Sequence, residues 1–226
     1  MLLAYVLTID GPAGAGKSSV AKRLAQLLGI HYLDTGAIYR AIALVLAEEG
    51  VRPEESESLT QALPGIRIEL RGGAVLANGV DVSREIRTPR ADKLSSVYSA
   101  LPSVRRALLG LQRDQEQYGS LVVEGRDEGS VVFPKAPLKF FLTATPEARA
   151  RRRCLERERR GEPVSYEEVL AAIRERDIAD SSREVSPLVQ PEGAVRIDTS
   201  DMTEDEVVEC LLSRVRDALA KGEISA

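Results

Sequence analysis

The sequence predicts an α/β fold with three layers, in which helices cover both faces of a mainly parallel β-sheet. Apolar strands alternate with amphipathic helices along most of the chain, and this alternation implies right-handed crossovers between parallel strands. Residues 66–82 break the rhythm, because short β-prone runs are separated there by a Gly-Gly and an Asn-Gly pair, which are hairpin signals. We therefore expect a small antiparallel insert and, from the charged run at 149–160, a helical lid.

Each element follows from apolar spacing and turn residues. Residues 5–10 form an apolar strand, and residues 17–28 have helical spacing that Gly29 ends. The other predicted elements are a strand at 31–33, a helix at about 36–48, strands at 120–124, 138–143 and 194–198, and helices at about 146–160, 165–179 and 203–219. We expect one domain over residues 1–226, containing an insert at 61–104 and a lid at 149–165.

Composition excludes several classes of protein. The net charge of −4 argues against general attraction to nucleic acid or anionic membranes. No apolar run approaches the ~20 residues that span a bilayer, and the first ten residues lack a basic signal-peptide region. Cys154 and Cys210 have neither metal-ligand spacing nor a disulfide framework. We expect a cytoplasmic monomer.

Residues 11–18 read GPAGAGKS, which matches the pattern G-x-x-x-x-G-K-[ST] between a predicted strand and a predicted helix. Such a loop surrounds phosphate oxygens with backbone N–H groups at a helix N-terminus. Lys17 would reach the β- and γ-phosphates of ATP, and Ser18 would bind Mg²⁺. The fold is thus of the P-loop NTPase type. The predicted nucleotide-binding residues are Gly11, Pro12, Ala13, Gly14, Ala15, Gly16, Lys17, Ser18 and Ser19.

Arginines at the ends of elements favour a kinase that transfers phosphate from one nucleotide to another, because they could neutralise the two sets of phosphates brought together. They are Arg40, Arg105, Arg126, Arg176 and Arg183. A phosphate acceptor is already ionised near pH 7, so the reaction needs no general base. His31, the sole histidine, is accordingly interpreted as structural.

The run RARRRCLERERR at 149–160 allows two interpretations. It is either a solvated helix with Glu–Arg pairs or a mobile lid that closes over the transferred phosphoryl group. We favour the lid, because Gly161 and Pro163 could act as a hinge. Arg152 and Arg153 would then join Lys17 and Arg126 as catalytic residues.

The chain as a whole resembles the bacterial cytidylate (CMP/dCMP) kinases. The resemblance is carried by IDGPAGAGKSS at 9–19, LDTGAIYR at 33–40, DVSREIRTP at 81–89, PSVRRALLGLQR at 102–113, EGRDEGSVVFP at 124–134 and IRERDIADSSREVSPL at 173–188. It implies transfer of the γ-phosphate of ATP to CMP or dCMP with Mg²⁺, and an acceptor site beside the insert.

The resemblance also implies roles for single residues. Arg40 and Arg126 would hold the acceptor phosphate. The pyrimidine would be read by Arg105, Asp127 and Ser96, and the sugar and phosphates would be surrounded by Arg176, Asp180 and Arg183. Two positions depart from the family pattern: Thr35, also an expected acceptor residue, replaces a common serine, and Glu124 replaces a common aspartate.

Two alternatives remain open at this point. The acceptor could be UMP, AMP or a shikimate-like metabolite, or the chain could be an ATP-binding regulator without turnover. The insert, likewise, could be an excursion that contacts no ligand.

Overall fold

The computed structural model describes residues 4–159 and 161–224, which fall into two compact units. The first unit comprises residues up to 33 and from 115 onward, and the second comprises residues 34–114. No helix in the described part of the chain is long and apolar enough to cross a membrane.

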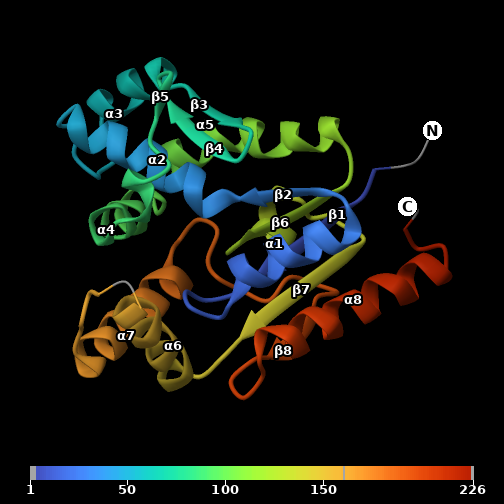
Figure 1. Ribbon diagram of the computed structural model, residues 1–226. Helices are drawn as coiled ribbons and strands as arrows, with labels where there is room; N and C mark the ends of the chain where they lie inside the picture. The colour runs from blue at the N-terminus through green and yellow to red at the C-terminus, as the bar shows by residue number, and fades with distance from the viewer. Residues whose placement is uncertain (1–3, 160, 225–226) are drawn as a thin grey trace. The chain divides into compact units, whose positions relative to one another are not determined.

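The first unit contains a five-stranded sheet in the order β2-β6-β1-β7-β8 (Figure 1). β1 pairs in parallel with β6 and β7, and β7 pairs in parallel with β8. The strands are β1 (Val6–Asp10), β2 (His31–Asp34), β6 (Leu121–Gly125), β7 (Leu138–Thr143) and β8 (Val195–Asp198). The helices are α1 (Lys17–Leu28), η3 (Asp114–Tyr118), η4 (Glu128–Val132), α6 (Pro146–Arg159), α7 (Tyr166–Ser182) and α8 (Glu204–Ala220).

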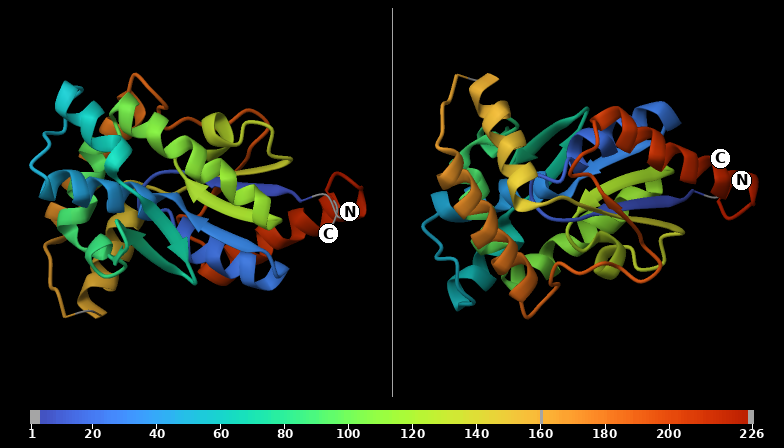
Figure 2. Two further views of the ribbon diagram at one scale, coloured as in Figure 1. Left: turned by 90° about the horizontal axis from the view of Figure 1, so that it is seen from above. Right: turned by 90° about the horizontal axis from the view of Figure 1, so that it is seen from below.

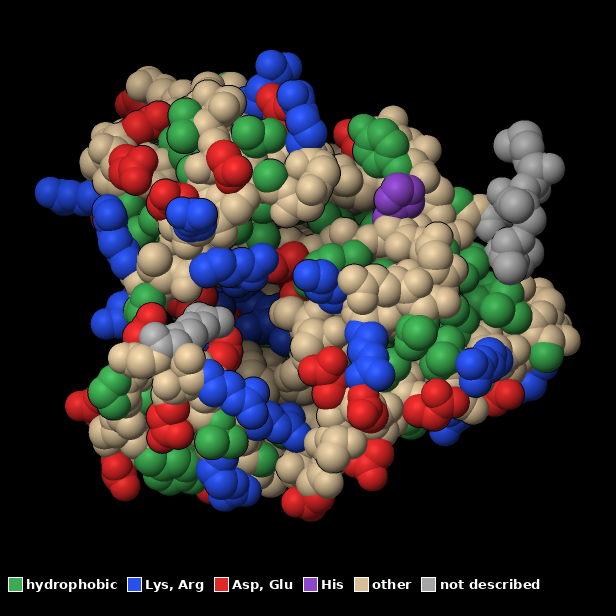
Figure 3. All heavy atoms as spheres, viewed as in Figure 1, with side chains coloured by type: hydrophobic (Ala, Val, Ile, Leu, Met, Phe, Trp, Pro, Cys, Tyr) green, Lys and Arg blue, Asp and Glu red, His purple; other side chains and the backbone are tan. Residues whose placement is uncertain are grey.

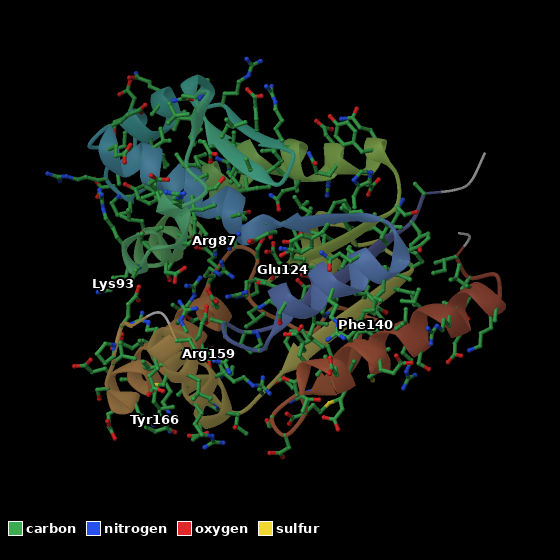
Figure 4. The ribbon with its side chains drawn as sticks, viewed as in Figure 1. Arg87, Lys93, Glu124, Phe140, Arg159 and Tyr166 are labelled. Atoms are coloured by element: carbon green, nitrogen blue, oxygen red, sulfur yellow. The ribbon has the colours of Figure 1, made fainter. Side chains whose placement is uncertain are left out.

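The core of this unit lies between one face of the sheet and the helices α1 and α8, which pack against each other (Figure 2). Alternate residues of β1, Leu7 and Ile9, point into it with Phe140 of β7, which is labelled in Figure 4. Thr8 and Asp10 consequently lie on the opposite face of β1, where Asp10 contacts η4. A smaller apolar cluster holds α6 against α7.

The second unit is built on α2 (Thr35–Glu48), which packs against α4 (Pro89–Tyr98). Its antiparallel sheet has the order β3-β4-β5, as the sequence predicts. The other elements are α3 (Glu57–Ala62), η1 (Leu63–Gly65), β3 (Ile68–Arg71), β4 (Ala74–Ala77), β5 (Val80–Asp81), η2 (Glu85–Arg87) and α5 (Pro102–Arg113). The predicted insert at 61–104 thus lies within a larger unit.

Candidate active site

The loop between β1 and α1 has the geometry of a phosphate cradle. Gly11, Gly14 and Gly16 have φ of 146°, 78° and 86°, values that L side chains rarely adopt. A Cβ at Gly11 would lie 1.9 Å from the Leu142 carbonyl oxygen, so this position requires glycine. Gly16 caps α1 without a side-chain bond from the described residues, which leaves the first N–H groups of the helix for an anion.

Lys17 is buried at the start of α1, and its Nζ donates to the Pro12 carbonyl at 2.9 Å. Burial, followed by the positive charge of Arg126, brings the pKa of Lys17 down to about 7. The carboxylates of Glu124, Asp10 and Asp180 act in the opposite direction. An incoming anion would reverse the imbalance and favour the charged form of this lysine.

Ser18 of α1 and Glu124 of β6, the latter labelled in Figure 4, form an oxygen pair. The Ser18 hydroxyl donates to Glu124 Oε1 at 2.6 Å, and the Tyr32 hydroxyl lies 3.5 Å from the same oxygen. A hydroxyl and a carboxylate are the hard ligands that Mg²⁺ takes, usually together with substrate phosphates and water. Within the described residues no group of three His, Cys, Asp or Glu could hold a metal alone. The pair therefore fits Mg²⁺ that arrives with a nucleotide.

Three arginines converge on one buried carboxylate of α7. Arg126 Nε donates to Asp180 Oδ2 at 3.0 Å, while Arg176 and Arg183 each approach Asp180 at 3.7 Å. Burial alone would raise the pKa of Asp180, but the charges of the three guanidinium groups outweigh it and lower that pKa. Three positive charges on one negative charge leave an excess that attracts an anion.

Arg126 and the adjacent Asp127 follow directly from β6. The Asp127 side chain is buried, and its backbone carbonyl, just before η4, accepts from the N–H groups of Val131 and Val132 at the end of that short helix. Because Arg126 influences the pKa of Lys17, and Asp127 that of Asp10, this segment lies close to the phosphate loop. The structure thus brings the predicted nucleotide loop and the unit's predicted acceptor residues together.

The second unit carries the other predicted acceptor residues, Thr35, Arg40, Ser96 and Arg105. Arg40 lies 3.1 Å from Asp34 Oδ2, and Arg87 lies 2.9 Å from the same oxygen. Burial alone would raise the pKa of Asp34, but Arg40 and Arg87, with the Ala37 N–H, hold it below its ordinary value. The sequence reasoning missed Asp34 and Arg87, although both lie within the stretches of family resemblance.

The remaining residues of this set lie on the helices around α2. Thr35 is buried as the first residue of α2, and Ser96 is half-buried on α4. Arg105 is buried on α5, donates to the Ser99 carbonyl at 3.0 Å and lies over the ring of Tyr39 at 5.2 Å. This packing holds the Arg105 guanidinium in a fixed orientation.

The predicted lid has anchored and exposed arginines. Arg149 is buried; it binds both carboxylate oxygens of Asp177 and donates to the Ala13 carbonyl of the phosphate loop at 3.1 Å. Arg152 donates to the backbone and hydroxyl of Thr199, whereas Arg153 pairs with Glu156 at 3.7 Å. Figure 3 shows basic side chains among acidic ones over α6 and α7. Residue 160, part of the predicted lid, lies outside the described residues.

A glycine-rich loop before a helix, a buried lysine, a hydroxyl–carboxylate pair and an arginine cluster together define a P-loop phosphotransferase. The family model for cytidylate kinase matches residues 7–217. The cytidylate kinase of Caldanaerobacter subterraneus subsp. tengcongensis is 50% identical over 98% of this chain and 99% of its own. For that of Fervidobacterium nodosum the identity is 49%, with 93% and 96% covered. The chain belongs to the cytidylate kinase family.

A solved structure extends the likeness of fold. An uncharacterized protein from Eubacterium ventriosum superposes with a TM-score of 0.52 at 13% identity, covering 95% of this chain and 99% of that one. At such low identity the likeness shows a shared fold alone.

Proposed function

We propose that this chain transfers the γ-phosphate of ATP to CMP and dCMP, giving ADP and CDP or dCDP. The observation that carries the proposal is the joint presence, in one unit, of the phosphate loop and the arginines around Asp180. The choice of CMP as the acceptor is supported by relatives that match nearly the whole chain and are named cytidylate kinase. We place the enzyme in the cytoplasm as a monomer.

Catalysis in this proposal rests on positioning and on charge stabilisation. Lys17, once charged, would balance the negative charge that develops on the transferred phosphoryl group, and Arg126 would do the same for the acceptor phosphate. Ser18 and Glu124 would hold Mg²⁺, which supplies neutralisation of the phosphate oxygens when it is bound. No side chain has to remove a proton, because the acceptor oxygen is already ionised.

The acceptor would be recognised in three parts. Arg40 and Arg126 would bind the phosphate, and Asp180 with its neighbouring arginines Arg176 and Arg183 would bind the sugar and phosphates. Asp127, Arg105 and Ser96 would read the base, with Thr35 close to it. The insert at 61–104 would take part in acceptor binding, and Arg152 and Arg153 of the lid would stabilise the transition state.

An acceptor panel tests the proposal. Release of ADP is measured with ATP and, in turn, CMP, dCMP, UMP, AMP, shikimate, cytidine or no acceptor. We expect turnover with CMP and dCMP at least ten-fold above UMP in kcat/KM, since one mispaired buried polar group costs about 1–3 kcal/mol. Turnover of cytidine equal to that of CMP would contradict the acceptor model. ATP binding without turnover of any acceptor would instead indicate a regulator.

Asp127 tests how the base is read. An ionised carboxylate only accepts hydrogen bonds, and cytosine offers an amino group where uracil offers a carbonyl. The Asp127→Asn variant should therefore lose selectivity, because its amide can donate to uracil. The measurement is kcat/KM for CMP and for UMP in both proteins. An unchanged CMP:UMP ratio in a variant that still binds ATP would exclude this role.

A further inference from the structure

Asp10 is a fully buried carboxylate that ends β1, immediately before the first glycine of the phosphate loop. It is a member of neither the nucleotide-binding set nor the acceptor set described above. A buried carboxylate is costly unless its oxygens are hydrogen-bonded, so its partners indicate what it does.

Both oxygens of Asp10 bind the segment that follows the acceptor residues. Oδ1 accepts from the Glu128 N–H at 2.8 Å, and Oδ2 accepts from the Gly129 N–H at 2.8 Å. These N–H groups come directly after Arg126 and Asp127 in the chain. One side chain thus ties the strand that leads into the phosphate loop to the turn that presents the acceptor residues.

The contact leaves little room for adjustment. A Cβ at Gly129 would lie 2.7 Å from Thr8 Oγ1, 3.0 Å from Pro191 Cγ and 3.2 Å from Asp10 Oδ2. Thr8 packs on the same glycine as Asp10 does, yet its buried hydroxyl has no hydrogen-bond partner among the described residues. Thr8 is therefore a suitable control position, because it packs against Gly129 as Asp10 does but makes no side-chain hydrogen bond to another described residue.

The charges around Asp10 belong to both halves of the reaction. The pKa of Asp10 is raised to about 6, because burial outweighs the two N–H bonds that lower it; the charge of Asp127 also raises this pKa, and the charge of Lys17 lowers it. Asp10 therefore interacts electrostatically both with Lys17 of the phosphate loop and with Asp127.

We propose that Asp10 is a positioning residue for the acceptor, which fixes Arg126 and Asp127 at a set place relative to the phosphate loop through the N–H groups of Glu128 and Gly129. It contacts neither reactant and acts through the backbone of the turn. The inference rests on the proposed function, because its consequence is the alignment of CMP with ATP.

The test compares Asp10→Asn with Thr8→Val in the full chain. Asparagine keeps the shape of aspartate, but its NH₂ group cannot accept a hydrogen bond, so one of the two backbone N–H donors loses its acceptor. We expect KM for CMP to rise about ten-fold and the CMP:UMP ratio of kcat/KM to fall at least about three-fold, consistent with a lost charge-assisted bond. The ATP dissociation constant should change less than about three-fold. Thr8→Val, which removes a hydroxyl that has no hydrogen-bond partner among the described residues, should leave all three values unchanged.

A merely structural role would lower Tm in Asp10→Asn while the CMP:UMP ratio and both affinities stayed at wild-type values, and this result would overturn the proposal. If Asp10→Asn does not fold, Gly129→Ala displaces the same turn from its other side and should raise KM for CMP in the same way; an unchanged KM would then overturn the proposal. Wild-type protein inactive toward CMP would refute the proposed function instead, and CMP affinity measured by calorimetry would still report on the turn.

Discussion

Binding of ATP should draw a proton onto Lys17. The pKa of Lys17 in the free protein is about 7, because burial and the charge of Arg126 disfavour the ammonium form. At pH 8 only about one molecule in eleven then carries the charge. The phosphates of ATP would restore the pKa toward its ordinary 10.5, so binding should take up about 0.9 proton at pH 8 and about half a proton at pH 7.

Calorimetry in buffers of different ionisation enthalpy measures this uptake. The slope of the observed enthalpy against buffer enthalpy gives the number of protons taken up per ATP. The Lys17→Met variant is the control, because it subtracts any proton that ATP itself exchanges. The reasoning would be refuted by equal uptake in both proteins at pH 8, or by wild-type uptake that does not fall between pH 8 and pH 6.

Three further outcomes are expected. Arg40→Ala and Arg126→Ala should each lower kcat/KM for CMP by roughly ten- to a hundred-fold, the value of one charge-assisted bond, with steady-state kinetics as the measurement. Replacing both Arg152 and Arg153 by alanine should lower kcat more than ATP affinity. An unchanged kcat would favour the interpretation of residues 149–160 as an ordinary solvated helix rather than a lid. Thr203→Ala, which removes the capping box of α8, should reduce the free energy of unfolding by about 1 kcal/mol in urea titrations; an unchanged midpoint would argue against the cap.

The fold was predictable where local signals are strong. Helix α1 begins and ends at the predicted residues, since Gly29 supplies a left-handed cap. Helices α4 and α5 were not predicted as separate elements, although Pro89 and Pro102 stand at their first turns. The apolar spacing of α4 is weak in isolation, and packing against α2 stabilises this helix. Helix α5, in contrast, has clear amphipathic spacing, which sequence reasoning overlooked.

The positions of Lys17 and Ser18 at the start of α1 were predictable, because the loop motif fixes the local geometry there. Partners that are distant in the chain were not predictable: Asp10 bonds to residues 128 and 129, more than a hundred positions away. Sequence reasoning also treated Arg149 as part of a mobile lid, because nothing in a charged run reveals that Asp177 lies opposite one member. The sequence indicated which residue types were present, and the fold decided their contacts.

Because Arg149 is buried, its position should tolerate substitution far less than the neighbouring positions of the charged run. A lysine there would keep the charge but could not bond both oxygens of Asp177 while reaching the Ala13 carbonyl, since an ammonium lacks the planar fork. Arg153 is half-exposed beside Glu156, where a lysine would keep the charge that this ion pair requires. In a saturation library selected for growth, position 149 should therefore retain arginine, whereas position 153 should accept lysine as well as arginine.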